Sequence, residues 1–253
     1  MSSKAYWAKR TLLAEKKAAA LGEQLVKEQG KMYVKTYNKL MREIEHLATK
    51  ANISIDDISR TELYDYGRML NLKEIIETEF TELTVAMDKG TESMLAKVYT
   101  DTLGRAAKDF GKEFVMPNEF QIKAVVEEVF HGSNYSKRIW SNNKALGGRV
   151  QQDMERLVMR GTSPQKIAKE LQRDFNVGYS NAERLVRTEA SRVYNVARED
   201  SYKEFGIDKV EFLAETDACD VCSGYDGKVY ETGQGPIIPV HPRCRCAYAP
   251  VID

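Results

Sequence analysis

Residues 177–206 read VGYSNAERLVRTEASRVYNVAREDSYKEFG and form the clearest helical pattern in the chain. Ser180 and Glu183 have the spacing of a capping box at its start, and Gly206 is a typical stop signal. On a helical wheel one apolar face gathers Ala182, Val186, Val193 and Ala197. The pattern predicts an amphipathic helix with one buried face.

Glu189 falls on that same apolar face. An unpaired buried carboxylate costs several kcal/mol, so Glu189 needs a partner. Arg187 and Arg192 fall on other faces of the helix, so we expect the partner to come from elsewhere in the fold. A structural ion pair or hydrogen bond is the favoured interpretation. A catalytic carboxylate is the alternative, although no second acid or histidine is spaced to assist it.

The chain before this helix is also helical, because apolar residues recur every three or four positions through most of it. After Pro117 we expect a short helix with Ile122, Val125, Val126 and Val129 facing inward. Gly147 and Gly148 interrupt the next helix and indicate either a kink or a close helix crossing. The expected earlier and later helices span residues 4–50, 71–88, 91–111 with Thr91 as cap, 134–160, and a segment that Ser163 and Pro164 begin.

After Gly206 the sequence pattern changes from that of helices to that of short strands and loops. Three stretches alternate as short strands do, DKVEFLAE, GKVYET and CAYAPV, and four of the six prolines lie in the last 18 residues. We therefore predict a mainly α protein, an elongated helical body with a small C-terminal α+β module stapled by zinc. The predicted domains are an N-terminal helical arm at 1–110, a helical body at 111–206 and a zinc-knuckle-like β module at 207–253.

All four cysteines lie in the final 35 residues. Cys219 and Cys222 have the spacing of half a zinc knuckle, and HPRCRC adds His241, Cys244 and Cys246. Tetrahedral zinc takes four ligands, so one of these five donors is spare. We favour Cys219, Cys222 and Cys244, with Cys246 as the fourth ligand and His241 as its contender.

The alternatives for the thiols are two disulfides or four free cysteines. No signal peptide and no membrane-spanning run is recognisable, so we expect a reducing compartment, in which clustered cysteines more often hold metal. A catalytic zinc would need a general base, and neither a His-x-Glu before Pro-Cys-x-x-Cys nor a His-Glu-x-x-His motif occurs. The sequence thus predicts a structural Zn²⁺.

Nucleic-acid binding has weaker support. The 38 basic and 38 acidic side chains cancel, whereas proteins that coat nucleic acid are normally strongly basic. Arg243 and Arg245, beside the cysteines, are candidate contacts to phosphate or to an acidic partner. No phosphate-binding loop or nucleophile motif appears, so we expect no small-molecule substrate.

Four stretches in order, GTSPQKIAKEL, AERLVRTEASRVYNVARED, CDVCSGYDGKVY and HPRCRC, resemble the head-morphogenesis family of tailed phages, the Mu F-like minor head proteins. The resemblance covers about residues 138–250, and the first 110 residues do not share it. Many members have PPxHP before the last cysteines, where this chain reads IIPVHP. The family pattern falls on Arg187, Thr188, Glu189, Asn195, Cys219, Cys222, Gly227, His241, Pro242, Cys244 and Cys246.

The resemblance implies a low-copy capsid component at the portal vertex that acts in head assembly or in DNA packaging and ejection, without enzymatic activity. Its expected partners are the portal protein and capsid or scaffold proteins, with double-stranded DNA as a further candidate and no membrane insertion. The expected location is the virion interior, and the host cytoplasm during assembly. The alternatives are a DNA-binding internal protein ejected with the genome, and a metal-dependent nuclease or transferase centred on Glu189 and the cysteine cluster.

Overall fold

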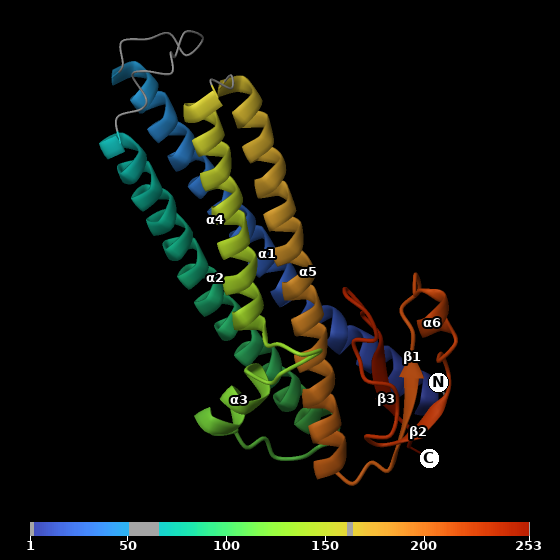
Figure 1. Cartoon of the computed structure of the whole chain (residues 1–253). Helices are drawn as coiled ribbons and strands as arrows, with labels where there is room; N and C mark the ends of the chain where they lie inside the picture. Colours follow the sequence, from blue (N-terminus) through green and yellow to red (C-terminus); the bar gives the residue numbers. More distant parts are fainter. Residues whose placement is uncertain (1–2, 51–65, 161–163, 253) are drawn as a thin grey trace. The chain divides into compact units, whose positions relative to one another are not determined.

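The computed structural model describes residues 3–50, 66–160 and 164–252. Five α-helices and a small C-terminal module of three strands and one helical turn account for most of these residues (Figure 1). The predicted fold class, mainly α with a small α+β module at the C-terminus, is confirmed. Among the described helices, none has the length and apolar character to span a bilayer. In chain order the elements are α1 (Ser3–Lys50), α2 (Tyr66–Asp109), α3 (Glu119–Val126), α4 (Tyr135–Arg160), α5 (Pro164–Glu204), β1 (Lys209–Leu213), α6 (Asp220–Ser223), β2 (Val229–Glu231) and β3 (Ala247–Pro250).

The chain forms two compact units. Unit 1 contains Met1–Val26, Gly90–Tyr135 and Arg184–Asp253, and unit 2 contains Lys27–Lys89 and Ser136–Glu183. Helices α1, α2 and α5 contribute to both units. The three domains predicted from the sequence have other boundaries and stay a prediction.

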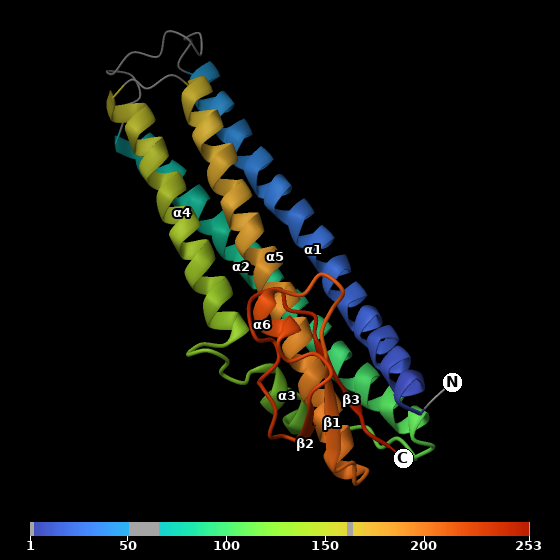
Figure 2. The same cartoon turned by 90° about the vertical axis from the view of Figure 1, so that its right-hand side faces the viewer.

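Unit 2 is a bundle in which segments of α1, α2, α4 and α5 lie side by side (Figures 1 and 2). A short polar network crosses its interior. The Tyr33 hydroxyl donates to Oδ1 of Asn143 at 2.8 Å, and Nδ2 of Asn143 donates to Oγ1 of Thr84 at 3.1 Å. These bonds satisfy polar groups that burial would otherwise penalise. The apolar core around them includes Leu40, Ile76, Phe80, Leu83, Met87, Ile139, Leu146, Val150, Leu171 and Phe175.

Helix α2 runs without interruption through the point where the sequence predicts a break, so the prediction of a helix cap at Thr91 is wrong. Thr91 is fully buried inside the helix. A Cβ added to Gly90 would lie 3.2 Å from Cδ1 of Leu25 on α1, so the glycine permits a close approach of the two helices. Tertiary packing on both sides of this glycine offsets its low helix propensity.

The capping box predicted at Ser180 and Glu183 is also wrong, because α5 already begins at Pro164 and passes through both residues. Gly178 is again a packing glycine, since Cδ2 of Leu146 lies 2.7 Å from where its Cβ would be. Gly206, at φ +71°, does end this helix as predicted.

The short helix predicted after Pro117 is α3, which Asn118 caps in a reciprocal capping box with Gln121. Of its predicted inward residues, Val126 is buried and Ile122 and Val125 are half-buried. The prediction for Val129 is wrong, because the helix ends before it and its side chain is 62% exposed.

The glycine pair in α4 marks a close helix crossing, and α4 continues through it as one helix. A Cβ on Gly147 would meet Cγ of the Phe80 ring on α2 at 3.2 Å. A Cβ on Gly148 would meet no atom of the described residues within 4 Å. The first glycine is thus required by packing, and the second is not.

We expect Gly148→Ala to raise the free energy of unfolding by up to about 1 kcal/mol, because alanine is the better helix former. Gly147→Ala should raise the free energy of unfolding clearly less, or lower it, because the Phe80 ring must shift. Urea unfolding monitored by circular dichroism measures both. Equal gains from the two substitutions would contradict the crossing.

Candidate metal centre

The C-terminal sheet brings the two halves of the cysteine motif together. Its order is β2-β1-β3, with both pairings antiparallel and Leu213 opposite Ala247. The end of β1 therefore lies beside the start of β3. The chain enters the segment that holds Cys219 and Cys222 shortly after leaving β1, and Cys246 directly precedes β3. Strand pairing thus brings the two segments that carry the four sulfur donors to the same end of the sheet.

The cluster could bind a metal ion. The candidate donors form two groups of three that share Cys222. The first group also contains Cys219 and His241, and the second contains Cys244 and Cys246. Within each group the ligand atoms lie within 4.8 Å of one another. Sγ of Cys222 and Sγ of Cys244 are 3.9 Å apart. Zinc–sulfur bonds of about 2.3 Å in a tetrahedron place sulfur atoms about 3.8 Å apart. A disulfide would need about 2.05 Å, and all four cysteines are free. The donor set and its spacing therefore fit zinc.

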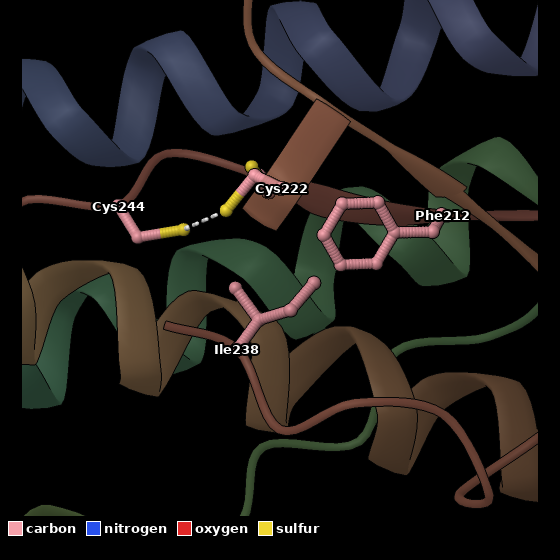
Figure 3. Close-up of a cluster of buried hydrophobic side chains, with 5 residues drawn as sticks. Phe212, Cys222, Ile238 and Cys244 are labelled. Atoms are coloured by element: carbon pink, nitrogen blue, oxygen red, sulfur yellow. Dashed lines mark hydrogen bonds between the residues drawn. The ribbon is translucent and has the colours of Figure 1, made fainter. Parts of the chain in front are cut away.

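Burial divides the five donors. Cys222, Cys244 and Cys246 belong to a buried cluster with Phe212 and Ile238 (Figure 3). Cys219 is exposed and His241 is half-buried. An ion held by the three buried thiols would thus be closed off from solvent by one more ligand. Both Cys219 and His241 lie on the cluster's more accessible side.

The thiols differ in acidity before any ion binds. A hydrogen bond from Cys246 lowers the pKa of Cys244 to about 5. Burial raises the pKa of Cys222 to about 12. A hydrogen bond to the Pro242 carbonyl raises the pKa of His241, and the nearby thiolates add to the effect. Cys244 thus ionises more readily than the buried Cys222, and a bound cation would displace the protons of the thiols that bind it.

His241 has one ring nitrogen engaged. Its Nδ1 lies 2.9 Å from the Pro242 carbonyl oxygen. A carbonyl accepts only from a protonated nitrogen, so this contact leaves Nε2 as the lone-pair nitrogen, a common arrangement for metal-binding histidines. Arg243 follows with φ +64°, which lets the chain turn sharply between His241 and Cys244.

Three side chains at seven-residue spacing on α5 hold the backbone around the second cysteine pair. Oγ1 of Thr188 accepts from the Arg243 amide at 3.1 Å. Nδ2 of Asn195 donates to the Cys246 carbonyl at 3.2 Å, and the Tyr202 hydroxyl donates to the Tyr248 carbonyl at 2.8 Å. Residues seven apart lie on the same face of a helix, nearly two turns apart. We call Thr188, Asn195 and Tyr202 the docking ladder.

Helix α1 holds the same module from another direction. Arg245 donates to both carboxylate oxygens of Glu15, through Nε at 3.1 Å and Nη2 at 3.0 Å. The Glu15 side chain is only 4% exposed, so the bidentate pair is shielded from solvent on that side. Lys4 adds an ion pair with Glu211 of β1 at 2.8 Å.

The partner of Glu189 lies on its own helix, so the prediction of a partner from elsewhere in the fold is wrong. Nε of Arg192 donates to Oε2 of Glu189 at 2.7 Å, and both side chains are buried. Residues three apart are neighbours on a helix surface, so Arg192 lies beside Glu189 and is buried with it. Its Nη1 and Nη2 also donate to the carbonyls of Val125 and Val126 at the end of α3, at 3.0 and 3.3 Å.

Arg187, the remaining motif residue, forms a bidentate ion pair with Glu23 of α1, at 2.6 Å through Nε and 2.9 Å through Nη2. The structure thus brings the five candidate donors into two groups that share Cys222, while Arg187 and Glu189 form ion pairs at other points of α5. Sequence reasoning missed Tyr202 of the docking ladder and the acids Glu15 and Glu23. Tyr202 could have been found, because it continues the seven-residue spacing of Thr188 and Asn195.

Comparison with known proteins gives one match. Residues 148–249 match the model of the family described as Phage Mu protein F like protein. No curated protein and no solved structure matches the chain. Residues 148–249 are therefore similar to the Mu F-like domain, and the resemblance stated from the sequence is confirmed over these residues.

We expect Asn195→Ala to lower the free energy of unfolding by about 1–3 kcal/mol, because the buried Cys246 carbonyl loses its donor. The loop around Cys244 should also become more accessible to trypsin at Arg243. Asn176→Ala, at an exposed position of α5, is the matched control and should change neither. An Asn195 variant with normal stability and normal proteolysis would contradict the docking ladder.

Substitution can decide between Cys246 and His241, the two contenders named from the sequence. We expect Cys246→Ser to abolish stoichiometric zinc binding and His241→Gln to preserve it, because the Cys246 thiol lies in the buried group with Cys222 and Cys244. Metal content after purification, with a colorimetric zinc titration, measures both. The reverse result would make His241 the fourth ligand.

Proposed function

We propose that this protein is a minor head protein of a tailed phage, which acts without enzymatic activity at the portal vertex in head assembly or in DNA packaging and ejection. The observation that carries the proposal is that one Mu F-like domain, at residues 148–249, contains both the metal-donor cluster and the complete docking ladder. We place the protein in the virion interior, and at the assembly site before that.

In this proposal zinc is structural, and its ligands are Cys219, Cys222, Cys244 and Cys246. Structural zinc sites are closed by four protein ligands, whereas catalytic sites leave one position for water. The C-terminal module has a small buried cluster, Phe212 of β1 and Ile238 with the buried thiols. A bound ion would cross-link this segment and give unit 1 one fixed surface for a virion partner.

The contacts of the motif residues support a structural role. Arg187 pairs with Glu23, and Glu189 pairs with Arg192, which also holds the end of α3. A catalytic carboxylate would have to approach a substrate, whereas Glu189 is fully buried. These residues therefore fit a role in fixing α5 against α1 and α3 within unit 1.

Double-stranded DNA stays a secondary candidate partner. Arg245 is used in the bidentate pair with Glu15, which leaves less of its charge for phosphate. Arg243 is exposed at a sharp turn of the loop. With zero net charge overall, the protein lacks the general basic excess that supports nonspecific binding.

The test is co-expression with the portal protein and the major capsid protein of the same phage, followed by affinity purification and size-exclusion chromatography. We expect the zinc-loaded protein to co-elute with the portal protein. Cys222→Ser should weaken this association, because the surface of unit 1 is no longer fixed by the ion. The control is Lys73→Ser, which introduces serine at an exposed residue that is not a cysteine. This variant should bind the portal protein as the unchanged protein does.

Absence of any virion partner, together with a shift of duplex DNA that weakens steeply as salt rises, would contradict the proposal and favour the DNA-binding alternative. Turnover of a nucleic-acid or nucleotide substrate that Glu189→Gln abolishes without loss of stability would instead favour an enzyme.

A further inference from the structure

Unit 2 contains a groove that the docking of the C-terminal module does not use. It lies between residues 27–42 of α1 and residues 172–179 of α5, and its volume is about 930 Å³. This is at the upper end of the size of ordinary ligand pockets. The groove is open to solvent, and all of its lining residues belong to unit 2.

The walls of the groove carry charge of one sign. Four of its described lining residues are basic, and none is acidic, although the chain as a whole has equal numbers of both. Lys27, Lys31 and Lys35 follow one another at four-residue spacing, so they form an exposed row along α1 with steps of about 6 Å. Arg42 extends the basic wall further along the same helix.

The floor of the groove is apolar. Val34 is 59% exposed there. Tyr37 and Phe175 meet edge to face at 5.5 Å between ring centroids, and Tyr33 meets Phe175 similarly at 6.3 Å. Tyr33 and Phe175 are buried beneath this contact, so the accessible apolar surface of the floor comes from Val34 and the half-buried Tyr37.

We propose that this groove is the docking site of an acidic amphipathic helix from a partner protein. Its apolar face would cover Val34 and the aromatic floor, and its carboxylates would pair with Lys27, Lys31 and Lys35. Helix-in-groove recognition combines such an apolar strip with charges at its edges, which set orientation and partner choice. This inference stands apart from the proposed head-protein function and from the metal centre.

A nucleic acid fits the groove less well. Phosphates would pair with the lysines, but an apolar floor gives a sugar-phosphate backbone no compensation for lost hydration. Bases could gain from stacking on exposed aromatic faces. Here Phe175 and Tyr33 are buried and packed edge to face, and the Tyr33 hydroxyl is bonded to Asn143.

The experiment uses the full chain and a fluorescein-labelled peptide of about 18 residues, long enough to form a helix on the groove, with leucines on one face and glutamates on the other. We expect saturable binding by fluorescence anisotropy with a Kd in the micromolar range at low salt, weakened as salt rises. Three control probes are a scrambled peptide of the same composition, the same leucine pattern with lysines for glutamates, and a DNA oligonucleotide.

Two variants with matched controls locate the site. Lys27→Glu/Lys31→Glu/Lys35→Glu should weaken peptide binding at least about tenfold. Lys73→Glu/Lys89→Glu/Lys169→Glu changes the net charge equally at exposed lysines of unit 2 outside the groove, and it should bind nearly as well. Val34→Asp should likewise abolish most binding, whereas Val177→Asp, exposed on α5 outside the groove, should not.

Circular dichroism checks that the variants fold. If the variant with three glutamates does not fold, Lys27→Gln/Lys31→Gln/Lys35→Gln replaces it. The proposal is overturned by no saturable peptide binding up to about 1 mM, or by equal loss in groove and control variants. Equal binding of the scrambled or cationic peptide would also overturn it. Groove-dependent binding of the oligonucleotide in place of the peptide would assign the site to nucleic acid.

Discussion

The C-terminal module depends on one constraint: sulfur atoms from two separate turns must be held about 4 Å apart inside a core of very few apolar residues. Cys222 and Cys244 meet at 3.9 Å, next to Phe212 and Ile238. Small modules of this kind rarely bury enough apolar surface to offset their conformational entropy. A bound metal ion would add the missing stabilisation, since its binding free energy becomes folding free energy.

The module is also fixed from outside, and the docking ladder explains how the two parts of the Mu F-like domain act together. Asn195 of α5 binds the carbonyl of Cys246, a proposed zinc ligand, so the helix and the cluster share a backbone segment. Arg245, between the last two cysteines, reaches Glu15 of α1. A change at the metal centre would therefore alter the contacts of both α1 and α5 within unit 1. The hydrogen bonds that join these helices to the module begin within two residues of the cysteines.

Much of this was predictable from the sequence, and the failures have a common cause. Helix type, the three strands and the clustering of cysteines follow from local periodicity and spacing. The helix breaks expected at Thr91 and Ser180 do not exist, because Gly90 and Gly178 serve close packing between helices that local patterns do not reveal. The Glu189 partner was mislocated because Arg192 was assigned to another helix face, whereas residues three apart are neighbours and Arg192 is itself buried.

The most direct measurement is limited trypsin digestion of the protein, purified without added zinc, before and after removal of bound metal by a chelator. The account predicts about one zinc per chain, and cleavage at Lys228 and Arg243 that appears only after chelation, while sites in α2 keep their resistance. Substoichiometric metal with oxidised thiols, or a tail equally resistant with and without chelator, would contradict it.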